Sequence, residues 1–278
     1  MKTILLPTDF SQTAQHAADF ALSLTLLLDA KLVIINVIQP IADAYNIPMS
    51  SSHFYQYAEE TAETAMDRFK EKMIARHKMS LEPSPVIETK VVYGNISSTI
   101  LDVAKDLKTD FIVMGMVGDR TIIDNIFGSN ALKISKRAEC PVWVIPQNTK
   151  IHKIKTVVYV TDLEGNEITF IKKTIDILKV MGATLKAVHI HEEFEPEIFP
   201  SHSMIEKIKE ALGDNSVKFE NLERADVVKG IENYIENQRP DALVIAHQDK
   251  SWLERLLYKS VISELTLKSQ IPVLILQK

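Results

Sequence analysis

Three glycines and a serine stand at a spacing that suits phosphate binding. The chain holds eight glycines, and three of them, Gly115, Gly118 and Gly128, fall in one short stretch that leads to Ser129. Glycine lets the main chain approach a ligand closely, and the first amides of a helix attract anions. If Ser129 opens a helix, this stretch predicts a cradle of main-chain amides for phosphate, with the Ser129 hydroxyl as a further donor.

A purely structural interpretation of the same residues stays open. Glycine after a strand can serve a tight turn alone, and Ser129 can act as a helix N-cap. The sequence shows no nucleophile and base at a recognisable spacing and no Gly-Lys-Ser/Thr phosphate loop. Asp119, Arg120 and Asp124 are the candidates near the cradle for phosphoryl transfer. A dedicated catalyst is therefore not expected, and whether the protein is an enzyme stays open.

The histidines offer a second candidate site. His189 and His191 lie two apart in a strand-like run, and with His247 and Asp162 they could converge on a zinc ion. Among eight histidines some pairings arise by chance, and we favour that interpretation. Cys140 is the single cysteine, which excludes an intramolecular disulfide and a Cys-based zinc cluster. No metal site is predicted.

The elements that must position these residues occur twice. Strand-like runs of the two halves align without gaps in two blocks: TILLPTD (3–9) with TVVYVTD (156–162), AKLVIINV (30–37) with ATLKAVHI (183–190), DFIVMGMVG (110–118) with DALVIAHQD (241–249), and CPVWVI (140–145) with IPVLIL (271–276). The first half carries extra residues, including IADAYNIPMSSSHFYQYAEE (41–60). We predict two copies of one unit, domains 1–147 and 152–278, joined near the polar PQNTKIHK.

Within each copy, short β-branched runs alternate with longer segments of helical period. This alternation predicts an α/β fold in which helices cover both faces of a parallel sheet. In the first copy, strands are predicted near 3–7, 31–37, 86–92, 111–115 and 142–145. Helices are predicted near 12–28, 55–78, 96–107 and 128–138.

The polar residues gather where predicted strands end. Ligands of open parallel sheets bind beyond the carboxyl ends of the strands, where strand order reverses. Asp9 follows the first strand, Val37 ends the second, and Gly115 ends the fourth. If the first and fourth strands are neighbours, these turns face one crevice. Asp9 has a structural alternative, as the N-cap of the helix that follows it.

These residues resemble the universal stress protein family, in the tandem arrangement with two domains in one chain. Nucleotide-binding members carry G-x2-G-x9-G-(S/T), which Gly115, Gly118, Gly128 and Ser129 satisfy. ILLPTDFS is similar to the family's first strand and its following aspartate, and CPVWVIP to its last strand. The resemblance covers essentially the whole chain and implies a five-stranded parallel sheet ordered 3-2-1-4-5 in each copy, a Rossmann-like nucleotide-binding α/β fold.

The resemblance also implies a ligand, ATP with Mg²⁺ or a related adenine nucleotide, in the first domain. Asp9, with Pro7, Thr8 and Val37, would surround adenine and ribose. The phosphates would lie against a second set, with Arg120 as countercharge: Gly115, Gly118, Gly128, Ser129 and the main chain of Asn130. Met114, which precedes Gly115, is also included among the predicted nucleotide-binding residues. Some members of the family hydrolyse ATP slowly or autophosphorylate, so weak activity of this kind is compatible with the resemblance.

The second copy departs from the motif. Ala246, Asp249 and Lys259 stand where the glycines should be, and Ser260 alone remains. Side chains now occupy positions where main chain had to approach phosphate, and Asp249 adds a negative charge. We predict that this copy does not bind ATP in the same way.

Composition limits the possible partners. The formal charge of −5 is modest and spread along the chain, so neither nucleic acid nor a membrane surface is expected as a partner. Charges interrupt the longest apolar runs, and the N-terminus lacks a signal-peptide pattern. We expect a cytoplasmic protein. By the resemblance, the halves pair through their final strands as an intramolecular pseudo-dimer, and two chains could form a homodimer.

Three functional hypotheses follow. The first is a stress-response sensor or regulator whose conformation depends on ATP bound in the first domain. The second is a nucleotide-independent interaction module with an unknown protein partner, in which the inserted aromatics Tyr45, Phe54, Tyr55 and Tyr57 form the contact surface. The third is a slow ATPase.

Overall fold

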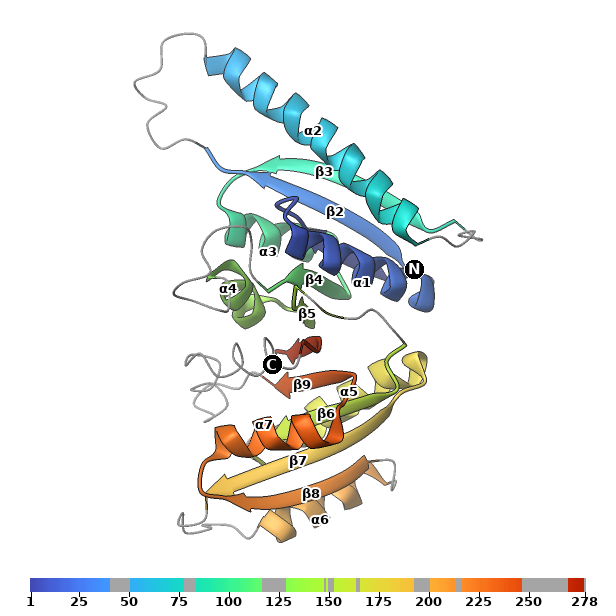
Figure 1. The fold of residues 1–278 in the computed structure, drawn as a ribbon, viewed down its shortest axis with the longest axis vertical. Coiled ribbons are helices and arrows are strands. Elements are labelled where there is room, and N and C mark those ends of the chain that lie inside the picture. The colour runs from blue at the N-terminus through green and yellow to red at the C-terminus, as the bar shows by residue number, and fades with distance from the viewer. Residues whose placement is uncertain are drawn as a thin grey trace. The chain divides into compact units, whose positions relative to one another are not determined.

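The computed structural model of the protein describes residues 1–40, 51–77, 84–116, 129–147, 149, 153–163, 166–192, 201–213, 217–246 and 270–277. The described residues up to 147 form one compact unit, and those from 149 onward form a second. Each unit is an α/β layer structure built on a parallel sheet (Figure 1).

The sheet of the first unit has the predicted strand order, β3-β2-β1-β4-β5. Its strands are β1 (Thr3–Pro7), β2 (Lys31–Ile38), β3 (Val86–Tyr93), β4 (Phe111–Gly115) and β5 (Val142–Ile145). All neighbouring pairs are parallel, with Pro7 opposite Ile35 and Leu5 opposite Ile112. The order reverses between β1 and β4, which is the switch point that favours ligand binding in such sheets.

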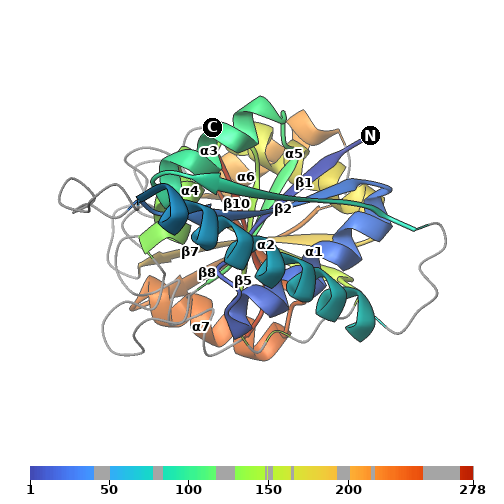
Figure 2. The ribbon, with the colours of Figure 1, turned by 90° about the horizontal axis from the view of Figure 1, so that it is seen from above.

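Two helices cover each face of this sheet. The helices are α1 (Gln12–Leu28), α2 (Ser51–Arg76), α3 (Ile96–Asp106) and α4 (Ser129–Arg137). Helices α1 and α2 pack together on one face, and α3 and α4 on the other (Figure 2). The small residues Ala14, Ala17 and Ala21 form a buried stripe on α1, as their spacing predicts, because they let the helix lie close to the strands.

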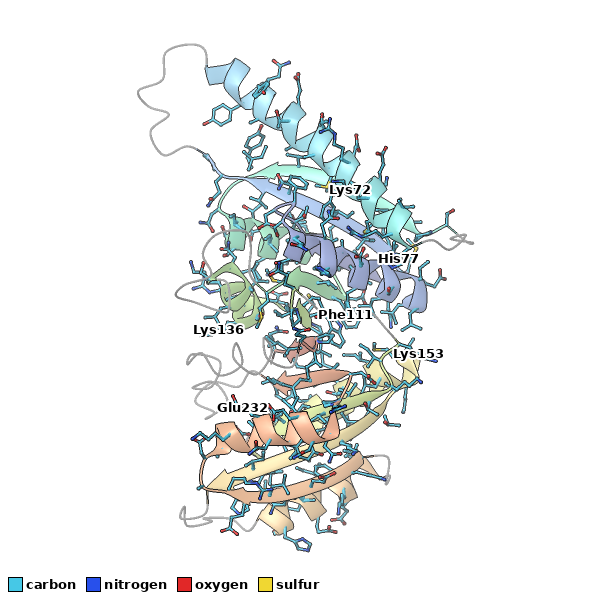
Figure 3. The ribbon with its side chains drawn as sticks, in the orientation of Figure 1. Lys72, His77, Phe111, Lys136, Lys153 and Glu232 are labelled. Atoms are coloured by element: carbon cyan, nitrogen blue, oxygen red, sulfur yellow. The ribbon has the colours of Figure 1, made fainter. Side chains whose placement is uncertain are left out.

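Helix α2 begins at Ser51, earlier than the predicted start near residue 55. The polar residues at its start show no apolar period from which a helix could be predicted. At its other end the helix is tied to α1 (Figure 3). Arg76 donates from both Nε and Nη2 to Asp19 Oδ1 at 3.0 and 2.8 Å, and His77 Nε2 lies 3.2 Å from Ser23 Oγ.

The second unit repeats the topology, with strand order β8-β7-β6-β9-β10. Its strands are β6 (Thr156–Thr161), β7 (Thr184–Glu192), β8 (Val217–Arg224), β9 (Ala242–Ala246) and β10 (Val273–Leu276). Its helices are α5 (Glu167–Met181), α6 (Ser201–Leu212) and α7 (Val227–Gln238). Helices α5 and α6 contact each other on one face, and α7 packs against β7 and β8 on the other (Figure 1).

The core of each unit lies on both faces of its central strands. Ile4, Leu5 and Leu6 of β1 are fully buried, as strands of a covered parallel sheet must be. Among the described residues, Trp143 and Tyr159 are the largest fully buried side chains, one in each unit. Among the residues described, no helix combines the length and the apolar character needed to cross a membrane.

Candidate functional site

The predicted site residues of the first unit gather at one edge of the sheet. Strands β1, β2 and β4 are parallel neighbours, so their carboxyl ends, after Pro7, near Val37 and at Gly115, face the same edge. Helix α4 returns between the parallel strands β4 and β5, so its first residue, Ser129, also lies at that edge. The sheet therefore brings the described part of the predicted set together.

The loop after β1 is held by hydrogen bonds on both sides of Thr8. The Thr8 amide donates to the Ile35 carbonyl at 2.9 Å, and Asn36 Nδ2 donates to the Thr8 carbonyl at 2.8 Å. The Thr8 hydroxyl accepts from the amide of Phe10 at 3.0 Å. Thr8 is 6% exposed, so its side chain serves the loop. Phe10 takes φ 65°, a left-handed conformation that a non-glycine residue keeps only where its surroundings hold it.

Asp9 is exposed at the tip of this loop. Its Oδ1 accepts from the amide of Ser11 at 3.0 Å. Ser11 is the N-cap of α1, and its hydroxyl accepts from the amide of Ala14 at 3.2 Å. The alternative interpretation of Asp9 as the helix cap is therefore wrong, because that place in the turn belongs to Ser11. The Asp9 carboxylate keeps solvent-accessible acceptor capacity.

Three apolar residues of the predicted nucleotide site differ in burial. Pro7 and Val37 are half-buried, so each has apolar surface at the edge. Met114 is 7% exposed, which leaves its side chain little surface for a ligand.

Gly115 has a packing reason to be glycine. A Cβ at this position would lie 2.7 Å from Thr13 Cγ2 and 3.2 Å from the Thr13 carbonyl. Real Cβ contacts are not that short, so only glycine lets the end of β4 lie this close to the first turn of α1. This packing reason differs from the tight turn named as the structural alternative, since Gly115 has no positive φ, and it is compatible with a role in binding.

The start of α4 is accessible and is tied to α3. Ser129 is exposed and Asn130 is half-buried. Ser97 Oγ, near the start of α3, donates to Asn130 Oδ1 at 2.9 Å. The predicted residues Gly118, Arg120 and Gly128 lie outside the described residues, as do Asp119 and Asp124.

The second unit builds the same loop from different residues. The Thr161 hydroxyl accepts from the amide of Leu163 at 2.9 Å, and Leu163 takes φ 59°. His189 Nδ1 lies 2.9 Å from the Thr161 carbonyl. Asp162 is 6% exposed, whereas Asp9 is exposed. Ala246 is buried at the end of β9, and Asp249, Lys259 and Ser260 lie outside the described residues.

Buried ionisable groups line this corner of the second unit. Tyr159 donates from its hydroxyl to Glu167 Oε2 at 2.8 Å, and both residues are buried. Burial, followed by the Glu167 carboxylate and then the Asp162 charge, raises the pKa of the Tyr159 phenol well above its ordinary value. The rings of His189 and His191 stack with centroids 5.8 Å apart.

The zinc alternative finds no support in the part of the chain that the structure describes. No group of three or more His, Cys, Asp or Glu side chains there could hold a metal ion. His247, the third member of the proposed set, lies outside that part. Cys140, the single cysteine, is buried.

Comparison with known proteins agrees with this architecture. The sequence model of the Universal stress protein family matches residues 1–146 and, a second time, residues 153–277. The chain belongs to this family. A universal stress protein of Methanocaldococcus jannaschii is 29% identical over 149 residues, which cover 54% of this chain and 84% of that protein. One from Thermus aquaticus is 28% identical over 144 residues, covering 52% of this chain and 98% of its own length.

A solved structure shares the tandem fold. The crystal structure of a universal stress protein from Archaeoglobus fulgidus matches with a TM-score of 0.70 and 16% identity, over 99% of this chain and 96% of that one. At this identity the likeness speaks for the fold alone.

Two residues that position the site of the first universal stress protein domain were not predicted from the sequence. Asn36 holds the loop after β1, and Ser97 holds Asn130. Asn36 could have been noticed as a polar residue inside the apolar strand KLVIINVI, aligned with His189 in the repeat. Ser97 has no comparable signal, because its partner comes from a distant helix.

Proposed function

We propose that the first universal stress protein domain binds an adenine nucleotide, ATP with Mg²⁺, and that this binding makes the chain a regulator in the stress response. One observation carries the proposal: the complete glycine and serine motif joins the end of β4 to the start of α4, and an exposed aspartate lies in the loop after the neighbouring strand β1. This is the switch point of the sheet, where nucleotides bind in related architectures.

Each described residue has chemistry that suits a part of the nucleotide. The exposed Asp9 carboxylate can accept hydrogen bonds from ribose hydroxyls, and Pro7 and Val37 offer apolar surface to the adenine ring. The Ser129 hydroxyl and the first amides of α4 can donate to phosphate oxygens. Each contact with a helix dipole contributes only about 0.3–1 kcal/mol when exposed, so phosphate binding needs several donors together.

Magnesium would accompany the phosphates. Mg²⁺ is commonly held by one or two carboxylates together with substrate phosphates and waters, without a dedicated protein cage. Phosphate and water oxygens are the ligand type that this ion prefers. Bound Mg²⁺ would neutralise part of the phosphate charge.

The test is nucleotide binding by paired variants. Isothermal titration with ATP and Mg²⁺ should give binding for the full chain and a loss of at least about tenfold in affinity for Gly118→Lys and Gly128→Lys, since a side chain blocks main-chain approach. Asp249→Lys, at the equivalent position of the second domain, is the matched control and should leave affinity unchanged. Undetectable binding to the unaltered chain at millimolar ATP would reject the proposal.

A nucleotide-independent interaction module is the second candidate, and one observation favours it. Tyr57 on α2 is 70% exposed, which is unusual for a large aromatic side chain. Tyr55 instead packs edge-on against Tyr93, with ring centroids 5.9 Å apart, and so belongs to the fold. The side chains of Tyr45 and Phe54 lie outside what the structure describes. Partner capture that is lost in Tyr57→Ala and unaffected by Gly128→Lys would support this candidate.

The third hypothesis, slow ATP hydrolysis, is distinguished from the other two by its product, inorganic phosphate. Phosphate release by the full chain that falls in Ser129→Ala would indicate hydrolysis at the proposed site. Release that is equal in both proteins would show that Ser129 takes no part in it.

A further inference from the structure

The two domains hold their first strand-end loops in the same way, with different side chains. Asn36 Nδ2 donates to the Thr8 carbonyl at 2.8 Å, and His189 Nδ1 lies 2.9 Å from the Thr161 carbonyl. The repeat aligns Thr8 with Thr161 and Asn36 with His189 at one offset. The contact has therefore been kept while the residue that makes it changed.

The imidazole can replace the amide because of what the carbonyl requires. A carbonyl oxygen only accepts hydrogen bonds, so His189 Nδ1 must carry the proton. His189 thus supplies an N–H donor to the Thr161 carbonyl, as the Asn36 amide does to the Thr8 carbonyl.

In each loop, the carbonyl that accepts this hydrogen bond belongs to the residue directly before the aligned aspartate. Thr8 precedes Asp9, and Thr161 precedes Asp162. The next residue in each loop, Phe10 or Leu163, takes a left-handed conformation with φ 65° or 59°. Such a turn is strained for a residue with a side chain and persists only where neighbouring contacts hold it. The side chain from the second strand of each sheet supplies one of these contacts.

We propose that Asn36 and His189 are equivalent positioning residues, which fix the strand-end loops and thereby the places of Asp9 and Asp162. For the first domain the consequence for ligand affinity rests on the proposed nucleotide site, because Asn36 acts on the ligand only through Asp9 and its loop. For the second domain the role of His189 is independent of any nucleotide.

Exchange of the loop amides in the full-length protein tests the positioning role directly. In Asn36→Ala the Phe10 and Ser11 amides should exchange about tenfold faster, while the amides of Ile4, Leu5 and Leu6 serve as the internal reference for global stability. Asn36→His should restore slow exchange, because His189 already performs this role at the aligned position. In the second domain, His189→Ala should speed exchange at Leu163, and His189→Asn should restore it.

ATP affinity provides the second readout. Asn36→Ala should weaken ATP binding about tenfold, Asn36→His should recover it, and neither His189 variant should change it. Equal exchange in Asn36→Ala and the unaltered protein would overturn the positioning role, and so would a histidine variant as damaged as the alanine variant. If the unaltered chain binds no ATP, the proposed function fails, while the exchange pattern still decides the positioning role.

Discussion

In each domain, the corner where the first strand ends and the next helix begins has the same backbone turn. The buried side chains at this corner differ in polarity between the two domains. In the first domain, Leu6 and Ala14 are apolar neighbours of the loop. In the second, the aligned positions hold Tyr159 and Glu167, joined by a buried hydrogen bond of 2.8 Å. The difference teaches that this fold tolerates buried polar groups at the corner when each has a partner, because the partner replaces the lost water.

Another polar contact has been kept in both domains. Asp110 Oδ2 accepts from the Thr3 amide at 2.7 Å, and Asp241 Oδ2 accepts from the Thr156 amide at 2.8 Å. These carboxylates lie at the amino ends of the strands, opposite the proposed ligand edge. The two domains thus share this polar contact at the amino ends of their strands, and their side chains differ at the opposite edge, where a ligand would bind.

The largest loss of stability is expected when a carboxylate is introduced into the apolar corner of the first domain. Ala14→Glu places a carboxylate at a position that is 5% exposed, without the tyrosine that serves Glu167. An unpaired buried charge should lower the free energy of unfolding by about 3–5 kcal/mol. Urea denaturation measures the loss, and Gln12→Glu at an exposed position of the same helix is the control. A cost below about 1 kcal/mol would contradict the comparison.

Breaking the polar pair in the second domain should cost less. Tyr159→Phe removes the donor to Glu167 and should lower the free energy of unfolding by about 1–3 kcal/mol. A double-mutant cycle with Glu167→Met isolates the pair, and its coupling should be about 1 kcal/mol or more. Additive single effects would show that the two side chains do not act together.

Substitution of the two aligned aspartates, Asp9 and Asp162, should affect different properties: ligand affinity in the first domain and stability in the second. Asp162→Ala, at a buried position, should cost about 1–3 kcal/mol of unfolding free energy. Asp9→Ala, at an exposed position, should cost only about 0.5 kcal/mol and instead lower ATP affinity. Denaturation and titration of both variants make the comparison. Equal stability losses would remove the distinction between the loops.

The smallest effect concerns alkaline pH. Burial and the Glu167 carboxylate raise the pKa of Tyr159 in the folded protein above its unfolded value of about 10. The folded state therefore holds this proton more tightly, so the contribution is complete below about pH 10 and is lost as pH rises further. Stability should fall less steeply in Tyr159→Phe than in the unaltered protein. Identical slopes would remove Tyr159 as the cause.

Much of the architecture could be predicted because its signals are local. Each predicted strand of the first domain lies within a residue or so of its observed bounds, and α1 matches throughout, since period and composition are properties of short segments. The strand order came from the family resemblance and is confirmed. Helix α2 starts earlier than predicted because its first turn has no periodic apolar residues.

For the candidate site too, residues with a local sequence signal could be predicted, and contacts between separate elements could not. Gly115, Ser129 and Asp9 could be found as motif residues, yet the contact of Gly115 with Thr13 joins residues from different elements. The assignment of the α1 cap to Ser11 depends on a turn geometry that Asp9 and Ser11 could both satisfy on paper.

The sequence alone determined the twofold repeat, the parallel α/β class and the glycine motif confined to the first half, because these are patterns of residue type along the chain. Only the tertiary structure decided that Asn36 and His189 contact equivalent carbonyls, and that Tyr159 donates a hydrogen bond to Glu167. Hydrogen bonds depend on distance and direction between atoms, and the folding of the sheet brings these donors and acceptors together from separate elements.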